Sequence, residues 1–459
     1  MSFKKETGAS APVMDLVHGP VGKTLLLFSF PFMLSTLLQT LYSTVDTIIV
    51  GQFLGSAGLS AVANGTQLMQ MAYMLCIGFS NAGQVLIAQA KGAEQYGRMQ
   101  SIIGTLFALE TGLSFLVGTI CLVFVNPILQ LLKTPPEAIV QARYYIVICS
   151  IGIIFTGLYN MFSAVLRGMG DSKHPLLFVV IATGINVVLD LLFVAVFHWN
   201  VAGAALATIL GQAVSVVCSF LYLAFNSGRY GISFSLRKLQ VKKEIGRRIF
   251  GIGLPMALSG AAIQVSFLFV SGMVNRMGVD TSAAFGVTQK IRSIPGFMAQ
   301  GFGQGATSMI GQNLGADRKD RAGQTVRWCT VFCACVYGLF GILYLTVPQL
   351  LYRMYTQDPA VLSFARMTLT ILVLEIPASC FMQGSQALIN AQGFVKLSLA
   401  VAVLDAIAGR IFLCWLCGYA LHLGSCGLFL GNALGTYVTS VIVFGYYISG
   451  IWKKREKLV

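Results

Sequence analysis

Five carboxylates stand inside the long apolar stretches of this chain, and they are the side chains best suited to binding a proton or an ion there. They are Asp46, Glu110, Asp190, Glu375 and Asp405. If the stretches cross a membrane, an ionised side chain at the bilayer centre costs roughly 2.5–3.5 kcal/mol on insertion scales. Each acid is therefore a candidate functional residue, unless a nearby base pairs with it.

Asp46 and Asp190 are accompanied by other polar side chains at helical spacing. Gln39, Tyr42 and Asp46 are three and four residues apart, so on a helix they share one face. Asn186 precedes Asp190 by one turn, which puts an amide and a carboxylate on the same face. Both acids lie in the first half of the chain, and the sequence predicts that they share one polar site.

Three interpretations of this polar site are open. Two carboxylates in a low-dielectric pocket cannot both ionise cheaply, so one of them would take up a proton near neutral pH. Alternatively, the two carboxylates, the Asn186 oxygen and the Thr208 hydroxyl would form an oxygen cage for Na⁺. Either chemistry could couple an ion gradient to a conformational change. The third interpretation is structural, with the polar groups hydrogen-bonded between helices.

The acids of the second half have arginine and lysine residues as candidate partners. We expect Glu375 and Arg410 to form a buried ion pair, which Asp405 could join. Lys290 and Arg292 are alternative partners for one of these acids. A structural role is favoured for this second-half polar cluster, because charged residues inside membrane helices usually pair with one another.

The composition of the chain shows which elements must hold these residues. Hydrophobic residues make up 56% of the 459 residues and charged residues only 10%, whereas soluble domains carry about 25% charged residues. A helix needs about 20 apolar residues to cross a bilayer. The chain is therefore predicted to be an all-α polytopic membrane protein with twelve transmembrane helices. The predicted spans are 24–50, 57–87, 99–125, 138–165, 175–197, 201–225, 247–275, 281–310, 327–349, 361–389, 397–420 and 426–450.

The net charge of +15 follows the topology of these spans rather than indicating nucleic-acid binding. With a cytoplasmic N-terminus, most lysines and arginines fall in the segments predicted to be inside. The outside segments hold only Lys133, Arg143, Arg276, Arg353 and Arg366. This positive-inside pattern predicts a cell-membrane protein with both termini in the cytoplasm. The polar N-terminus has no apolar core followed by a cleavage site, so it is not predicted to be a signal peptide.

The chain aligns with itself at an offset of 223–224 residues. The matches include Gly78-Phe79 with Gly301-Phe302, residues 87–93 with 310–316, Gly170 with Gly393, and Gly203 with Gly427. The offset spans six predicted helices, so the two halves enter the membrane in the same direction, as in parallel-repeat transporters. We expect a first lobe at 1–226, a basic cytoplasmic linker at 227–246 and a second lobe at 247–459.

Several function classes find no support in the sequence. A Gly-rich loop followed by Lys-Ser/Thr is absent, which disfavours an ATP-driven pump. The four histidines are not clustered as metal ligands, and the eleven cysteines show no paired metal spacing. The sequence therefore predicts neither an enzyme nor a protein with a structural metal or a cofactor.

Five short segments spread along the chain form a specific set. They are Val45–Gly51, Leu166–Asp171, Asn186–Asp190, Gly203–Thr208 and Gly253–Pro255. With these segments the chain resembles the multidrug and toxic compound extrusion (MATE) family, and within it the DinF-like branch. The resemblance implies two pseudo-symmetric six-helix lobes that form a V around a central cavity. It also implies a monomeric antiporter that exports amphipathic, often cationic, organic compounds by rocker-switch alternating access in exchange for H⁺ or Na⁺.

The resemblance also assigns roles to individual residues. The cation motif of the DinF-like branch maps onto Asp46, Asn186, Asp190 and Thr208, with Tyr145 and Asn160 as looser matches. A second-lobe cation site is not expected, because Gln264 stands at the helix-seven position and Glu375 is displaced along helix ten.

The substrate cavity is predicted to have an adaptable lining. Its candidates are Gln39, Tyr42, Met161, Phe162, Met256 and Gln264. The alternative is that these residues face lipid or lie between helices. A second candidate function is a flippase or exporter for a lipid-linked precursor or metabolite, which would need a strongly basic central cavity for pyrophosphate.

Overall fold

The structure is a computed structural model that describes residues 14–131, 136–232 and 240–459, and these residues form helices without any strand. The helices of the first half are α1 (Val21–Gly92), α2 (Tyr96–Val123), α3 (Val125–Leu131), α4 (Pro136–Gly168), α5 (Lys173–Asp190), η1 (Leu191–Val196), α6 (Asn200–Asn226) and η2 (Ser227–Tyr230). Those of the second half are α7 (Lys243–Asn275), α8 (Val279–Gly315), α9 (Lys319–Thr346), α10 (Pro348–Arg353), α11 (Pro359–Ser363), α12 (Ala365–Ala391), α13 (Val395–Leu404), η4 (Asp405–Phe412), α14 (Leu413–Trp415), η5 (Leu416–Ala420), α15 (Gly424–Ile448) and η6 (Ile451–Lys454).

The predicted twelve-span organisation is confirmed. Eleven helical stretches within the described residues are long and apolar enough to cross a membrane. Two of them lie in α1, which is interrupted at Gly55, where the backbone leaves the helical conformation. The remaining long helix is α8, which is more polar than the others because it carries several glutamines and a lysine–arginine pair. Helix α7 begins at Lys243, inside the stretch predicted as the linker.

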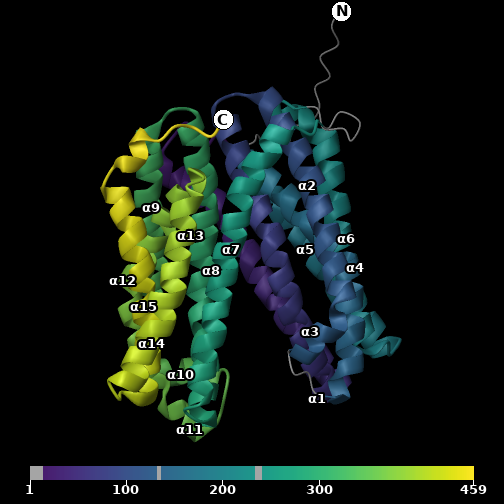
Figure 1. The fold of residues 1–459 in the computed structure, drawn as a ribbon, viewed down its shortest axis with the longest axis vertical. Coiled ribbons are helices and arrows are strands. Elements are labelled where there is room, and N and C mark those ends of the chain that lie inside the picture. Colours follow the sequence, from purple (N-terminus) through teal and green to yellow (C-terminus); the bar gives the residue numbers. More distant parts are fainter. Residues whose placement is uncertain (1–13, 132–135, 233–239) are drawn as a thin grey trace, which may run out of the picture.

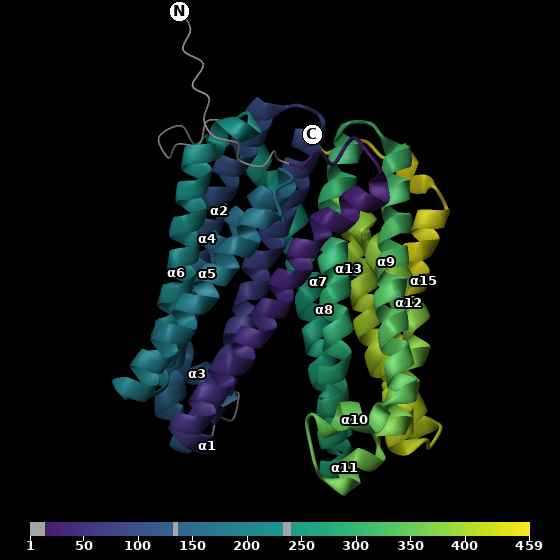
Figure 2. The same cartoon turned by 180° about the vertical axis from the view of Figure 1, so that it is seen from behind.

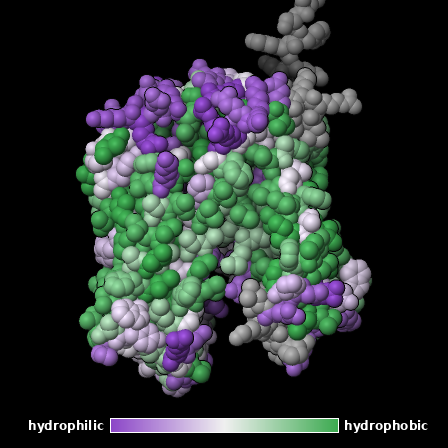
Figure 3. Space-filling model, in the orientation of Figure 1, coloured by the Kyte–Doolittle hydropathy of each residue, from purple (hydrophilic) through white to green (hydrophobic). Residues whose placement is uncertain are grey.

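The long helices form two bundles that converge at one end and separate at the other (Figures 1 and 2). The second part of α1 lies with α2, α4, α5 and α6, while α8, α9, α12, α13 and α15 form the other bundle. The C-terminus lies at the converging end, where hydrophilic residues gather, and the molecule is hollowed between the bundles at the opposite end (Figure 3). The predicted V-shaped arrangement is therefore confirmed.

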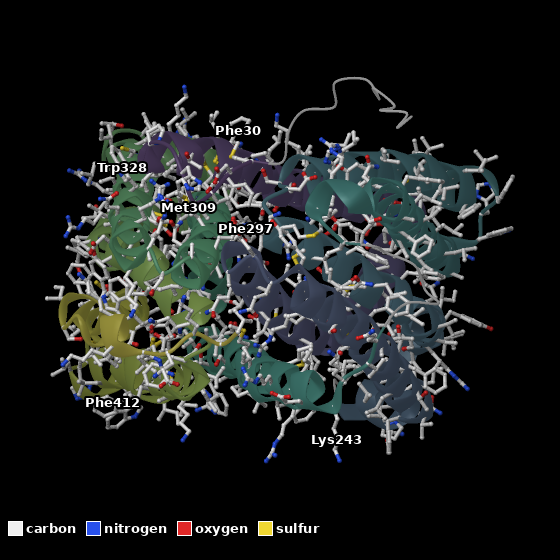
Figure 4. All side chains as sticks on the ribbon, turned by 90° about the horizontal axis from the view of Figure 1, so that it is seen from above. Phe30, Lys243, Phe297, Met309, Trp328 and Phe412 are labelled. Atoms are coloured by element: carbon white, nitrogen blue, oxygen red, sulfur yellow. The ribbon has the colours of Figure 1, made fainter. Side chains whose placement is uncertain are left out.

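The first helix contacts both bundles. Its start packs against α8 and α9, where Leu25, Phe28 and Met309 are buried in one cluster. Figure 4 shows Met309 on α8, near the start of α1 where Phe30 lies. Farther along, Val50 belongs to the core of the other bundle. Helix α1 therefore runs diagonally from one bundle to the other (Figure 2).

The backbone of the turns repeats at the same offset as the sequence. Residues with positive φ occur in matched pairs: Gly55 with Gly278, Glu94 with Asp317, Gly170 with Gly393, His198 with His422, and Asn200 with Gly424. Such conformations are uncommon outside glycine, so their recurrence at corresponding positions is strong evidence that the halves share one local fold.

A pseudo-symmetric crossing of α1 and α8 closes the converging end. A Cβ on Gly92 would lie 1.9 Å from the Gln312 carbonyl oxygen, and a Cβ on Gly315 would lie 2.1 Å from the Gln89 carbonyl oxygen. Two buried amides reinforce the crossing. Gln89 donates to the Ala391 carbonyl at 2.7 Å, and Gln312 donates to the Gly168 carbonyl at 2.9 Å.

Candidate functional site

Helices α1 and α5 bring the two first-half acids into one region. Asp190 ends α5 and is 1% exposed, while Asp46 on α1 is half-buried. The two carboxylates are near enough for their charges to interact. Among the described residues, neither oxygen of Asp190 has a hydrogen-bond partner, and Oδ1 of Asp46 is buried without one. Asn186 is also buried, with both amide atoms unpaired.

The packing of α5 against α6 places Thr208 at the level of Asp190. A Cβ on Gly211 would lie 3.1 Å from the Asn186 Cβ, and a Cβ on Gly203 would lie 3.0 Å from the Phe193 Cβ. Because α5 and α6 run antiparallel, these two contacts fix the register between them. Thr208 donates to its own helix at the Ala204 carbonyl, 3.0 Å away.

Helix α4 separates the two looser candidates. The Tyr145 hydroxyl bonds the Thr66 hydroxyl at 3.1 Å, and Tyr145 is near enough to interact electrostatically with Asp46. Asn160 is fifteen residues farther along α4, which is about 22 Å at 1.5 Å per residue. There it donates to the Thr156 carbonyl at 2.9 Å. Tyr145 and Asn160 therefore lie at different levels of α4 and do not contact the same point of the site.

The acids of the second half have arginine partners, although the pairing differs from the predicted one. Arg292 on α8 binds Glu375 on α12 through both carboxylate oxygens, with Nε 2.8 Å from Oε2. Thr436 also donates to Glu375, at 3.0 Å. Arg410 pairs with Asp405 at 2.9 Å rather than with Glu375. The predicted Glu375–Arg410 pair is therefore wrong, because Arg292 on the neighbouring helix already holds Glu375.

A π-helix explains the pairing of Asp405 with Arg410. The two residues are five positions apart, and an α-helix would place them on different faces. Segment η4 begins at Asp405 and has the i→i+5 hydrogen bonds of a π-helix, which bring positions five apart onto one side. Another π segment, η1, directly follows Asp190 in the first half.

The two bundles therefore differ in what their acids can bind. In the second bundle the two carboxylates inside the spans, Glu375 and Asp405, already have guanidinium partners. In the first, the oxygens of Asp46, Asn186 and Asp190 gather without a lysine or arginine partner among the described residues. Oxygen ligands of this kind suit a hard cation or a proton. Within the described residues, no group of three or more His, Cys, Asp and Glu side chains could hold a metal ion.

A polar chamber of about 150 Å³ lies between the bundles near their converging end. It is lined by Asn81, Gln84, Val85, Met256, Gln300, Gly303, Gln304, Thr307, Gln383, Gln386, Ala387 and Asn390. Of the predicted cavity residues, Met256 lines this chamber. Met161 and Phe162 instead lie in the core of the first bundle, 0% and 1% exposed.

Two other predicted cavity residues, Gln39 and Gln264, are not part of the chamber lining. Gln39 on α1 is exposed and Gln264 on α7 is half-buried. The side chain of Tyr42 lies outside the described part of the chain. The chamber is therefore built mainly from residues that the sequence reasoning did not select.

Comparison with known proteins gives the family. The MatE family model matches residues 31–192 and again 255–416, so it covers both halves of the chain. The chain belongs to the MATE family. The two matches are displaced by the offset of the internal repeat. As a MATE-family protein, the chain is a multi-pass membrane transporter and not an enzyme, and transporters of this family need no cofactor.

The MATE relatives extend over nearly the whole chain. It is 30% identical over 448 residues to the "Probable multidrug resistance protein YpnP" of Bacillus subtilis, covering 96% of this chain and 98% of that protein. It is 22% identical over 408 residues to the "Multidrug export protein MepA" of Staphylococcus haemolyticus, covering 86% and 89%. These relatives support efflux of small organic compounds as the coarse function.

Solved MATE structures share the fold. A crystal structure of MATE in the straight conformation has a TM-score of 0.91 at 20% identity, covering 97% of this chain and all of the other. An outward-facing multidrug resistance MATE transporter of the MOP superfamily also gives 0.91 at 20% identity, covering 98% and 100%. At this identity the likeness shows the fold alone.

The chamber carboxamides of this MATE protein did leave a signal in the sequence. Gln300 and Gln304 are one turn apart, and Gln383, Gln386 and Asn390 follow spacings of three and four residues. Each set therefore occupies one helix face.

Glu110 also has a partner that the sequence did not indicate, since the Ser80 hydroxyl donates a hydrogen bond to Glu110 Oε1 at 2.5 Å.

Proposed function

We propose that this MATE transporter is a secondary antiporter that exports amphipathic, often cationic, organic compounds in exchange for H⁺ or Na⁺. Coupling occurs at Asp46, Asn186, Asp190 and Thr208. The observation that carries the proposal is the asymmetry between the bundles: Asp46 and Asp190 have no cationic partner among the described residues, whereas Glu375 and Asp405 do. Tyr145 borders this site, and the arrangement agrees with the DinF-like branch.

The proposed cycle is a rocking motion of two lobes, 1–226 and 247–459. Hydrophilic residues gather at the converging end (Figure 3), where the chain end with Lys453, Lys454 and Arg455 lies. The positive-inside rule then places that end and both termini in the cytoplasm. The hollow between the bundles then opens to the outside. Binding of H⁺ or Na⁺ to the first-bundle acids removes their negative charge and favours return to the inward-facing state. The working unit is proposed to be a monomer.

The energy available sets a limit on this exchange. One charge moving through about 100 mV yields about 2.3 kcal/mol, and each tenfold concentration step costs about 1.4 kcal/mol. One proton therefore supports a gradient of somewhat less than a hundredfold for a neutral substrate. Exchange of one proton for one monovalent cation moves no net charge and would leave only the pH difference as the driving force.

The flippase alternative receives less support from the central chamber. A pyrophosphate-linked substrate requires a strongly basic cavity, whereas no charged side chain of the described residues lines the chamber. The polar lining consists of amides and one threonine. We therefore favour export of organic compounds.

The test is efflux of ethidium from vesicles containing the purified protein, with H⁺ and Na⁺ gradients imposed separately. We expect efflux to follow one gradient and to be lost in Asp46→Asn and Asp190→Asn. Asp280→Asn is the matched control, because Asp280 is exposed at the start of α8. Gradient-driven efflux that survives in both buried-acid variants would overturn the coupling site.

A further inference from the structure

The converging end of the central cleft contains a cluster of carboxamides that the coupling site does not use. Seven of the twelve residues lining the chamber are asparagine or glutamine. They come from α1 on one side and from α8 and α12 on the other. Gln84 is buried, whereas the other six amides are partly or fully exposed, so they can offer hydrogen bonds to a molecule in the chamber.

Part of the cluster is engaged in holding the wall of the chamber. Gln84 donates to the Ser308 hydroxyl at 2.8 Å and accepts from Arg167 Nε at 3.0 Å. Gln386 donates to Asn390 Oδ1 at 3.1 Å. These amides are accounted for by contacts within the protein.

Four other amides are not engaged in this way. The side chains of Asn81, Gln300, Gln304 and Gln383 make no hydrogen bond to any described residue, although all four line the chamber. Each carries two N–H donors and one carbonyl acceptor. Together they present donors and acceptors toward the same small volume from three helices.

The charge around the chamber argues against a cationic group there. No described lining residue is acidic. The charged group attached to the wall is Arg167, which repels a cation. The second-bundle acids Glu375 and Asp405 are already paired with arginine. An ammonium group in the chamber would therefore lose its water without gaining a counter-ion.

We infer that the chamber binds the uncharged hydrogen-bonding head group, an amide or a hydroxylated group, of the compound that this transporter exports. This inference rests on the proposed efflux function and specifies which part of the substrate binds at the converging end. A chamber of about 150 Å³ is smaller than the roughly 300–1,000 Å³ of pockets that hold whole drug-sized ligands. It therefore accommodates a head group, while the apolar remainder of the compound extends into the open part of the cleft.

The position of the chamber links occupancy to the state of the transporter. Asn81 lies on α1, whereas Gln304 lies on α8, only four residues before Ser308, which bonds α1 through Gln84. A head group bound to both sides bridges the two bundles just beside their closing contacts. Separation of the bundles at this end would break one set of these bonds and lower the affinity.

The test uses two fluorescent probes that share a dansyl group and an alkyl chain and differ only at the chain end. One ends in a primary carboxamide and the other in a trimethylammonium group. Binding to the purified full-length protein in nanodiscs is followed by fluorescence anisotropy. We expect Gln304→Leu and Gln383→Leu each to weaken binding of the carboxamide probe about fivefold, as expected for loss of one neutral hydrogen bond. Binding of the trimethylammonium probe should change less than twofold.

Two further variants separate a specific effect on the chamber from a general effect on the protein. Gln324→Leu alters an exposed glutamine on α9, outside the chamber, and should leave both probes unchanged. Gln383→Glu adds a carboxylate and should improve binding of the trimethylammonium probe relative to the carboxamide probe. Thermal unfolding of each variant verifies that it is folded. Equal effects on the two probes, or none on either, would overturn the inference.

Failure of this inference can be distinguished from failure of the proposed function. Probe binding is measured without any ion gradient, whereas antiport is measured by gradient-driven efflux in the aspartate variants. Gradient-driven efflux that depends on Asp46 and Asp190, together with probe binding insensitive to Gln304 and Gln383, would overturn the head-group site alone. Selective loss of the carboxamide probe without any gradient-driven efflux would overturn the antiport proposal alone.

Discussion

Arg292 and Glu375 illustrate how a single neighbouring side chain decides what a buried acid does. Glu375 accepts hydrogen bonds from Arg292 and Thr436, so it is well satisfied without a bound ion. Removing one partner of a buried pair leaves an uncompensated charge and typically costs about 3–5 kcal/mol. Because the Arg292 side chain is partly exposed, we expect Arg292→Gln to cost about 3 kcal/mol of unfolding free energy, at the low end of that range. Denaturant unfolding of the detergent-solubilised protein measures it.

The control for this prediction removes both charges. Arg292→Gln combined with Glu375→Gln leaves no unpaired ion, so the double variant should be more stable than Arg292→Gln alone. Equal stability of the single and double variants would show that the pair contributes through packing rather than through charge.

Asp171 gives a prediction for the pH dependence of stability, and it lies outside the spans, between α4 and α5. Burial alone would raise the pKa of Asp171, but hydrogen bonds from His174 and Tyr230 outweigh it and hold the pKa below its ordinary value. In the unfolded chain the pKa of Asp171 is about 3.9. Above that pH the ionised Asp171 contributes its full stabilisation to the folded state. This contribution is lost as the pH falls through the lower pKa of the folded protein.

The measurement compares unfolding of the wild type and Asp171→Asn between pH 7 and pH 3. The wild type should be the more stable protein at pH 7. The difference should shrink below about pH 4, where Asp171 takes up a proton in the unfolded chain while it stays ionised in the folded protein. A difference that stays constant through this range would mean that ionisation of Asp171 does not contribute.

The candidate acids were easier to find in the sequence than their partners. Asp46, Asn186 and Asp190 could be selected from the sequence, because a carboxylate in an apolar span is costly and helical spacing reveals shared faces. Arg292 could be named only as one of several possible partners for Glu375, since the residues are 83 positions apart and their contact depends on how α8 packs against α12. To bring the chamber amides together from the sequence, the packing of α1, α8 and α12 would also have to be known, because three helices contribute them.

The crossing of α1 and α8 is the element contact most sensitive to added volume. Gly92 approaches the Gln312 carbonyl so closely that an alanine Cβ would lie 1.9 Å from the oxygen. The helices must therefore move apart in Gly92→Ala. We expect a fall in thermal stability of at least several degrees and faster hydrogen exchange in residues 308–315, measured by mass spectrometry.

Gly272→Ala on α7 is the control for this crossing. It introduces the same methyl group in a long helix, but no atom lies within 4 Å of the new Cβ. Replacing glycine by alanine in an open helical position is expected to raise stability slightly. Equal thermal stability of Gly92→Ala and Gly272→Ala would show that the α1–α8 crossing tolerates an added methyl group.

Most helices were predictable, including the more polar α8, which matches the predicted span 281–310. Two features of the helices were not predictable. Apolar length located the spans, since a bilayer requires about 20 apolar residues in a row. The passage of α1 from one bundle to the other could not be anticipated from the sequence. The residues that pack against the first bundle and those that pack against the second are both apolar, so their composition does not show which bundle they contact. The π segment η1 has the composition of an ordinary apolar helix, so its hydrogen-bonding pattern leaves no signal in the sequence.

The closure of the whole molecule at its converging end depends on contacts between parts distant in sequence. The repeated Gln89 and Gln312 bonds tie each bundle to the other. The end of the chain adds a third connection, running from η6 across the converging end toward its centre (Figure 1). The Leu458 backbone N–H donates to Gln89 Oε1 at 2.8 Å, and Lys457 donates to the Gly315 carbonyl at 3.1 Å. The chain end therefore stabilises the state in which this end is closed.

Removing residues 456–459 should make the converging end open more often. The truncation deletes the bonds to Gln89 and Gly315, and it removes Leu458 from its place beside Gly393 and Ile252. We expect faster hydrogen exchange in residues 84–92 and 308–315, with unchanged exchange near Asp190. Glu456→Ala alters the same exposed segment without touching these bonds and should exchange like the wild type. Unchanged exchange after truncation would show that the α1–α8 crossing closes this end without the chain terminus.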